Sequence, residues 1–269
     1  MQPKLMRRMI ALGWLQIRRH TPDLRGKQWF SRTLTRLMGP VPLRSPDGLW
    51  LDTRLSSAMD LSFLDPAGGG HDLIREAIAK LQPGEHMLDV GANTGVFSLL
   101  ASQRVGPTGL VIAIEPSQRE FQQLLANLRL NQASNVLALN LASGEHAAIS
   151  QLTLEPDHTG LNRIESSNHR SRSHQLCQVL PLAVLQLGNL ALAKIDTEGY
   201  EVFTLRGLEP LLRQQTIQRL VVEISPTFLE QHQQTAADIY HLMARHGYRP
   251  ALGPLNEHQW DELFVANRL

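Results

Sequence analysis

The chain has 269 residues, of which 42% are hydrophobic and 19% are charged, and its net charge is +1. This length allows one large domain or two small ones around a substantial core, and the composition is ordinary for a soluble globular protein. Cys177 is the only cysteine, which excludes an intramolecular disulfide and is consistent with a reducing compartment.

The overall charge hides a strongly basic N-terminal segment. Residues 1–44 contain ten lysines and arginines against a single acid, Asp23, which gives them a charge of +9 and leaves −8 for the remainder. A basic arm of this kind is attracted to an anionic membrane, a nucleic acid or an acidic substrate. The alternative is that it packs on the acidic body of the same protein, and the sequence leaves both open.

Residues 1–40 are predicted to be helical. The apolar stretch 9–17 is too short to span a bilayer, which needs about 20 apolar residues, and it lacks the cleavage site of a secretory signal. Ile10, Trp14 and Ile17 fall at helical spacing and predict an amphipathic helix. We therefore expect a cytoplasmic protein, with peripheral contact to an anionic membrane through residues 1–40 as one alternative.

A short strand or hairpin and a flexible break follow the basic segment. Residues 46–55 combine a turn signal with alternating leucines, which predicts a strand or hairpin. The glycine-rich run 65–71 then marks a domain boundary. The prediction is a basic, helical N-terminal extension over residues 1–70 and a main domain over residues 71–269.

From residue 71 onward, strand and helix patterns alternate. Strands are predicted over residues 87–90, 109–116, 135–142, 148–155, 175–182, 190–196, 217–225 and 261–267. Helices are predicted over residues 96–104, 119–131, 200–214 and 235–247. Such alternation indicates a parallel, doubly wound α/β sheet with helices on both faces. Residues 157–175 are polar and irregular, and are expected to form a long surface loop.

The stretch MLDVGANTGVFSLL, residues 87–100, leads from a strand through a glycine-rich turn into a helix. Glycine tolerates positive φ and close approach to the backbone, and turns of this kind hold nucleotide-like ligands. A dinucleotide site is expected to show G-x-G-x-x-G. Here Gly91 and Gly95 form G-x-x-x-G, and Asp89 precedes Gly91 by two residues. That acid would repel a pyrophosphate, but it suits the ammonium and hydroxyl groups of S-adenosylmethionine, which has no phosphate.

Acidic residues also follow two other predicted strands. Glu115 lies 24 positions after Gly91, close to where a nucleotide-binding sheet places the acid that accepts from ribose hydroxyls. Asp196 and Glu198 lie at the carboxyl end of another strand, where ligands of open α/β sheets bind. They could bind the cofactor, orient an acceptor or take its proton. The alternative for Glu198 is that it caps the following helix, near Tyr200.

Several segments together resemble a known family. LDVGANTGVFSLLA, IAIEPSQREFQQLLANLRLN, LNLASGE and LAKIDTEGYEVFTLRGLEPLL, followed by VVEISP, look like the FkbM family of S-adenosylmethionine-dependent methyltransferases. The resemblance covers about residues 81–230. It implies the class I methyltransferase fold, which is a Rossmann-like, mostly parallel seven-stranded sheet, and methyl transfer to hydroxyl groups of polyketides, glycans or related metabolites.

The same resemblance implies a role for each group of strand-end residues. The methionine end of the cofactor would be lined by the glycine-turn residues Asp89, Gly91, Asn93 and Gly95. Glu115 would hold the ribose, and Ala142 and Ser143 would lie beside the adenine. Asp196 and Glu198 would face the methyl-transfer site. Relatives often carry a Gly-x-Tyr-Glu-like element before the first core helix, whereas this chain has GGGHDL.

We therefore expect an S-adenosylmethionine-dependent O-methyltransferase, with Glu198 as the first candidate for a general base and Asp196 as the alternative. The rivals are a methyltransferase acting on nucleic acid or protein, and a non-catalytic module that sits on a membrane. Amino-group methyltransferases of nucleic acids usually show Asn/Asp-Pro-Pro-aromatic after the fourth strand, and the Asp-Thr-Glu-Gly found here argues against that rival. No metal site is expected, because the spacing of His158, His169 and His174 matches no zinc pattern.

Overall fold

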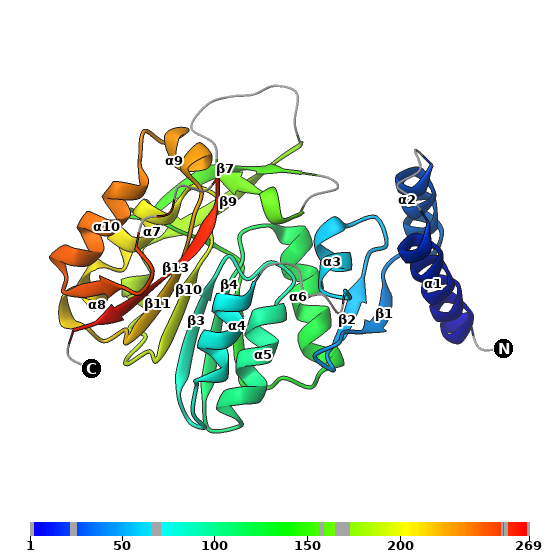
Figure 1. The fold of residues 1–269 in the computed structure, drawn as a ribbon, viewed down its shortest axis with the longest axis horizontal. Helices are drawn as coiled ribbons and strands as arrows, with labels where there is room; N and C mark the ends of the chain where they lie inside the picture. The colour runs from blue at the N-terminus through cyan, green and yellow to red at the C-terminus, as the bar shows by residue number, and fades with distance from the viewer. Residues whose placement is uncertain are drawn as a thin grey trace.

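The computed structural model describes residues 3–21, 26–65, 71–155, 159–164, 173–253, 255 and 258–267. Its centre is a seven-stranded sheet with the strand order β12-β13-β11-β10-β3-β4-β5 (Figure 1). The strands are β3 (His86–Val90), β4 (Leu110–Ile114), β5 (Val136–Leu139), β10 (Leu192–Ile195), β11 (Arg219–Ile224), β12 (Tyr248–Pro250) and β13 (Trp260–Ala266). Only β13 runs against the others, so the predicted doubly wound, mostly parallel sheet is confirmed.

Helices cover both faces of this sheet. One face carries α4 (Asp72–Ala79), α5 (Val96–Val105) and α6 (Gln118–Leu130), and the other carries α7 (Glu201–Gly207), α8 (Glu209–Gln214), α9 (Pro226–Glu230) and α10 (Ala236–Arg245). The central strands are apolar on both sides, as parallel strands buried between two helical layers must be. In β3, for example, Met87 joins the core beneath α5 while Leu88 joins the opposite core.

The strand order reverses between β3 and β10, which places a topological switch point at their shared carboxyl edge. Successive strands β4 and β5 extend the sheet on one side of β3, whereas β10 and β11 extend it on the other. The two strands are in register, with Val90 opposite Ile195. Ligands of open α/β sheets bind in the crevice at such a point.

A second, four-stranded sheet lies beside the first, in the order β6-β9-β7-β8. Its strands are β6 (Ala142–Ser143), β7 (Ala148–Leu154), β8 (Arg163–Ile164) and β9 (Ser173–Leu180), with the 3-10 turns η1 (Thr159–Leu161) and η2 (Leu182–Leu185) nearby. Cys177 belongs to its small core, and burial raises the pKa of this thiol to about 11. The cysteine is therefore a packed hydrophobe.

The N-terminal extension contains two helices and a β-ribbon. The elements are α1 (Pro3–His20), α2 (Lys27–Met38), β1 (Val41–Arg44), β2 (Trp50–Thr53) and α3 (Ala58–Ser62). The structure confirms the expected helices and hairpin. Figure 1 shows α1 and α2 set apart from the central sheet, with the ribbon and α3 between them and α6. The predicted boundary at 65–71 falls largely outside the described residues, because 66–70 are not among them.

Three predicted segments differ from the structure. The strand expected over 135–142 is divided, because β5 joins the central sheet and β6 joins the second sheet. The helix expected over 200–214 is interrupted at Leu208, and α8 restarts with Pro210 in its first turn. The expectation of a surface loop over 157–175 is wrong for residues 159–164, which form η1 and β8, and for residues 173–175, which begin β9.

Within the described residues, no helix is long and apolar enough to cross a bilayer.

Candidate functional site

A cavity lies at the carboxyl ends of β3, β4, β10 and β11, at the switch point of the sheet. It encloses about 1150 Å³ of space free of protein atoms, part of it open to solvent. The predicted residues on its wall are Gly91, Asn93, Glu115, Ala142, Ser143, Asp196 and Glu198. Parts of the second sheet and of the N-terminal extension complete the wall. The structure therefore brings most of the predicted site residues together.

Gly91 permits a close approach between the ends of β3 and β10. Its φ is +77°, and a Cβ placed there would lie 1.7 Å from the carbonyl oxygen of Asp196. Only glycine can occupy that position without moving one of the two strands. Asn93, two residues later, also has a positive φ of +50°. Asparagine tolerates this conformation better than most non-glycine residues, and it lets the turn bring Asn93 to the cavity wall.

Glu115 is held at the end of β4 by two backbone amides. Its Oε2 accepts from Asn93 N at 2.7 Å and its Oε1 accepts from Ser117 N at 2.8 Å. Only 5% of the residue is exposed, and burial raises the pKa of Glu115 to about 8. Each oxygen retains a further lone pair, so the carboxylate can still accept from a ligand hydroxyl in the cavity.

Lys194 ties the two central strand ends together. Its Nζ lies 3.0 Å from Asp196 Oδ2 and 3.6 Å from Asp89 Oδ1, and it donates to the carbonyl of Gly91 at 3.0 Å. Burial lowers the pKa of Lys194, but Asp196 and Asp89 together raise it above its ordinary value. The lysine therefore stays charged and fixes the orientation of Asp196 at the cavity wall.

Two predicted cofactor residues lie behind the cavity wall. Asp89 is fully buried, where it faces Lys194 and accepts a hydrogen bond from Ser98 Oγ at 2.5 Å. Gly95 has a φ of +82°, and a Cβ there would lie 3.0 Å from Leu124, so this glycine allows α5 to begin close against α6. Both residues shape the turn from outside the cavity, and neither is on its lining.

Glu198 adopts an unusual backbone conformation beside Asp196. Its φ is +53° although it is not glycine, which costs about 1–3 kcal/mol and is typical of functional sites. The residue is 8% exposed, and its Oε2 is buried with no hydrogen-bond partner among the described residues. Burial, followed by the charges of Asp196 and Glu201, raises the pKa of Glu198 to about 9.

The capping role considered for Glu198 falls instead to Glu201. Its Oε1 accepts from the backbone and hydroxyl of Thr197, both at 2.9 Å, and from Gly199 N at 3.1 Å. These contacts satisfy backbone donors just before α7. Glu198 is therefore left facing the cavity.

Sequence reasoning missed several residues of the wall. Glu223 from β11 is 8% exposed, and its carboxylate, with those of Asp196 and Glu198, forms a group whose oxygens lie within 4.8 Å of one another. The sequence signal that could have found Glu223 is a glutamate near the end of a predicted central strand. Met59 and Phe63 come from the N-terminal extension, which no local pattern could place here.

The three carboxylates have the spacing of a possible cation site, the one such group found within the described residues. The sequence expectation of no metal considered only the loop histidines, of which His158 and His169 lie outside the described residues. Lys194 already supplies one positive charge to this cluster, through its ion pair with Asp196.

His71, from the segment GGGHDL, lies on the cavity wall. Its ring lies 5.9 Å from that of Phe63 and 5.3 Å from that of Phe97, measured between centroids. Burial lowers the pKa of His71, which favours the neutral imidazole. The imidazole of His71 therefore bounds this side of the cavity. His71 directly precedes α4, the first helix of the main domain.

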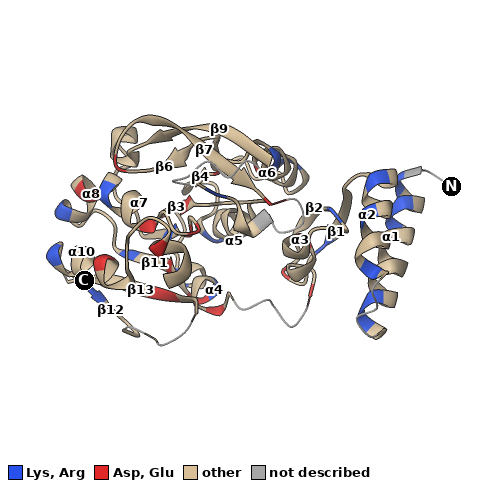
Figure 2. Cartoon of the chain, turned by 90° about the horizontal axis from the view of Figure 1, so that it is seen from above, with Lys and Arg blue, Asp and Glu red and all other residues tan. Residues whose placement is uncertain are grey.

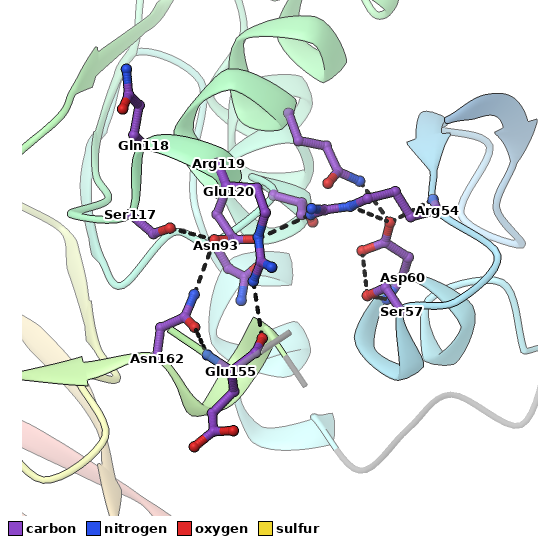
Figure 3. A network of polar contacts seen from close by, with 12 residues as sticks. Arg54, Ser57, Asp60, Asn93, Ser117, Gln118, Arg119, Glu120, Glu155 and Asn162 are labelled. Atoms are coloured by element: carbon purple, nitrogen blue, oxygen red, sulfur yellow. Dashed lines mark hydrogen bonds and ion pairs between the residues drawn. The ribbon is translucent and has the colours of Figure 1, made fainter. Parts of the chain in front are cut away.

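A polar network fastens the N-terminal extension to the cavity rim (Figure 3). Glu120, fully buried at the start of α6, accepts from Arg54 at 3.1 Å, from Arg119 at 2.7 Å and from Asn162 at 3.0 Å, and Ser117 also donates to it. Arg54 in turn lies beside Asp60 of α3. The extension, α6 and the η1 segment are thereby joined through one buried carboxylate.

Comparison with known proteins places this geometry in a family. Residues 89–250 match the methyltransferase FkbM domain. Among solved structures, the methyltransferase FkbM from Methylobacillus flagellatus superposes with a TM-score of 0.50 at 18% identity, covering 69% of this chain and 44% of that one. At that identity the likeness shows the fold alone.

Two curated relatives match shorter segments. The arsenite methyltransferase of Halobacterium salinarum is 38% identical over 61 residues, which are 23% of this chain and 16% of that protein. The 23S rRNA (uracil(1939)-C(5))-methyltransferase of Acinetobacter baylyi is 41% identical over 59 residues, which are 22% and 13%. The chain thus spans only a small part of either relative.

The family match covers the greater part of the chain, and the switch point of the sheet carries the expected residues. This protein therefore belongs to the FkbM-domain methyltransferases, with S-adenosylmethionine as the methyl donor.

Proposed function

We propose that the protein transfers a methyl group to a hydroxyl oxygen of a small molecule, sugar or glycan. The observation that carries this proposal is the carboxylate of Glu198, which faces the cavity from a strained backbone and has no protein hydrogen bond at Oε2 among the described residues. A carboxylate so placed can accept the proton of an acceptor hydroxyl. An aliphatic alcohol has a high pKa, so a base is more useful for it than for a more acidic acceptor.

The cavity fits S-adenosylmethionine. Gly91 and Asn93 line it from the glycine turn, and Ser143 Oγ is buried at the wall with no hydrogen-bond partner among the described residues. Glu115 would accept from the ribose hydroxyls, and Ala142 and Ser143 would lie beside the adenine. Asp196, Glu198 and Glu223 place three carboxyl groups beside the single Lys194, and a cationic ligand would favour the ionised forms of the two glutamates, whose pKa values burial raises.

When bound, the cofactor supplies a methyl group on a sulfonium. The protein's part is to position the acceptor oxygen in line and to receive its proton. Asp196 is tethered by Lys194, so we assign it to orientation of the acceptor. Glu198 has no such tether and is our first candidate for the base. The hydrophobic and aromatic side chains Phe63, His71 and Phe97 would exclude water on the acceptor side.

The direct test is turnover with a panel of alcohol, sugar and amine acceptors. We expect methylated products from hydroxyl acceptors, detected by a mass gain of about 14 daltons, and none with Glu198→Gln. The matched control is Glu230→Gln, an exposed glutamate on α9 that the cavity does not include. Methylation confined to amines would contradict the proposal.

A further inference from the structure

The two N-terminal helices carry an unusual density of positive charge. We call α1 and α2, with the described residues 3–21 and 26–38, the basic hairpin. It contains eight lysines and arginines and no aspartate or glutamate among those residues. In the ribbon of Figure 2, blue lysine and arginine positions recur along both helices, whereas the red acidic positions lie on other elements. The hairpin is therefore a strongly cationic surface.

Five of these cations have neutral hydrogen-bond or ring partners, and among the five Arg7 also interacts with the charge of Asp52. Arg7 and Arg19 donate to the carbonyls of Pro40 and Leu64, and Lys27 donates to two carbonyls at 2.6 and 3.1 Å. Arg18 donates to a serine hydroxyl, and Arg8 lies over the ring of Trp50 at 4.3 Å. Neutral partners orient these side chains without cancelling their field.

The same helices expose large apolar side chains. Nine of the sixteen exposed large hydrophobic residues in the described chain lie on the basic hairpin. They are Leu5, Met6, Met9, Ile10, Leu12, Ile17, Trp29, Phe30 and Leu37. Trp29 is 68% exposed and Leu37 is 76% exposed. A single exposed leucine needs no explanation, but a concentration of this kind marks an interaction surface.

The buried side of the hairpin is already occupied, so this exposure does not result from loose packing. Ala11 and Leu34 are buried against β1, and Trp14 stacks near Phe30 with ring centroids 4.5 Å apart. Trp14 Nε1 also donates to Ser31 Oγ at 2.9 Å. The hairpin is therefore fixed on the ribbon by one face while its apolar residues point elsewhere.

The basic hairpin does not form a lid over the cavity. The cavity wall takes Met59 and Phe63 from the N-terminal extension, but none of the described residues of α1 or α2. Both figures show the two helices beyond the ribbon, away from the switch point. The exposed face is thus free to meet a partner without closing the catalytic cavity.

We propose that the basic hairpin docks on a membrane surface rich in anionic lipid. Lysine and arginine meet the lipid phosphates, while tryptophan, leucine and methionine enter the boundary between headgroups and acyl chains. A nucleic acid would satisfy the charges but would leave the interleaved apolar side chains in water. This inference is independent of the proposed methyl acceptor, because it concerns a surface outside the cavity.

The test is co-sedimentation of the full-length protein with vesicles of 30% phosphatidylserine in phosphatidylcholine, beside vesicles of phosphatidylcholine alone. We expect binding at least tenfold tighter to the anionic vesicles, weakening as salt is raised. The double variant Trp29→Ser/Leu37→Ser should reduce binding at least tenfold, and so should Lys4→Glu/Arg36→Glu. Tryptophan fluorescence should shift to shorter wavelength on binding in the wild type.

Matched controls lie elsewhere on the surface. Ile149→Ser/Leu176→Ser removes two apolar side chains that are 69% and 72% exposed, and Lys80→Glu/Arg129→Glu reverses two exposed charges. Both should bind vesicles within twofold of the wild type. Binding of S-adenosylhomocysteine, measured on every variant, should stay unchanged. If the wild type itself does not bind S-adenosylhomocysteine, the proposed cofactor site is wrong, but the proposed docking surface is not affected.

Three results would overturn the proposal. One is no sedimentation of the wild type with anionic vesicles at low salt. Another is vesicle binding that the hairpin variants do not reduce. The third is a dimer in solution that Trp29→Ser/Leu37→Ser converts to monomers while vesicles are ignored, which would assign the apolar face to a second copy of the chain.

Discussion

Replacing Gly91 with alanine should destabilise the protein far more than glycine-to-alanine replacement at another positive-φ position. The new Cβ would lie 1.7 Å from the carbonyl oxygen of Asp196, about half of a normal van der Waals contact. The φ of +77° alone costs about 1–2 kcal/mol. Relieving the overlap also parts the ends of β3 and β10, which weakens the Asp196 N to Val90 O bond of 3.1 Å and the Lys194 contact to Gly91. Adding about 1–3 kcal/mol for these bonds, we expect a loss of about 2–5 kcal/mol.

Gly188→Ala is the matched control. Its φ is +68°, and no atom lies within 4 Å of the point that its new Cβ would occupy, so only the conformational penalty of about 1–2 kcal/mol applies. Urea denaturation of both variants gives the two free energies of unfolding, and calorimetry with S-adenosylhomocysteine reports the cofactor site. If the two variants lose stability equally, the close approach of the strand ends does not require Gly91, and the reasoning fails.

Glu115→Ala should weaken S-adenosylhomocysteine binding by about 1.5–3 kcal/mol, the range for hydrogen bonds to a charged group; unchanged affinity in a folded variant would remove the ribose role. For Glu198, the raised pKa of about 9 keeps the carboxyl protonated below that pH, so the basic form grows as pH rises. We expect kcat/KM to increase from pH 6 toward pH 9 in the wild type and in the Glu230→Gln control, whereas Glu198→Gln should form no product at any of these pH values; a flat wild-type profile would contradict this. Turnover should survive EDTA, because Lys194 already offsets part of the carboxylate charge; loss of turnover that Mg²⁺ restores would assign a cation to that cluster.

The strand-end residues of the site could be predicted because parallel strands bring their carboxyl ends to one edge. Gly91, Glu115 and Asp196 each follow an apolar run, and that pattern alone places them together. The sequence could not show that Asp89 faces Lys194 behind the wall, since both faces of β3 are buried and its alternation carries no polarity signal. The orientation of this aspartate depends on a partner 105 positions away.

Long-range contacts also explain part of the remaining differences. The division of β5 from β6 follows from pairing of Ala142 with Val179, on a strand that comes much later. The interruption after Gly207, in contrast, has a local signal, because Pro210 has no N–H to donate to the carbonyl of residue 206 in a continuous helix. Gly207 lets this end of α7 approach the second sheet, since a Cβ there would lie 2.1 Å from the carbonyl oxygen of Gly144. The basic segment was predictable as helical, but its free apolar face was not.

The attachment of the N-terminal extension at Glu120 has an evolutionary consequence. Met59, Phe63 and His71 line the cavity but precede residues 89–250, the part that matches the family. The residues that would hold the methyl donor all lie inside the matched part. Variation in the preceding segment would therefore change this wall of the cavity without altering the residues proposed to hold the methyl donor, as long as Arg54 still reaches the buried Glu120.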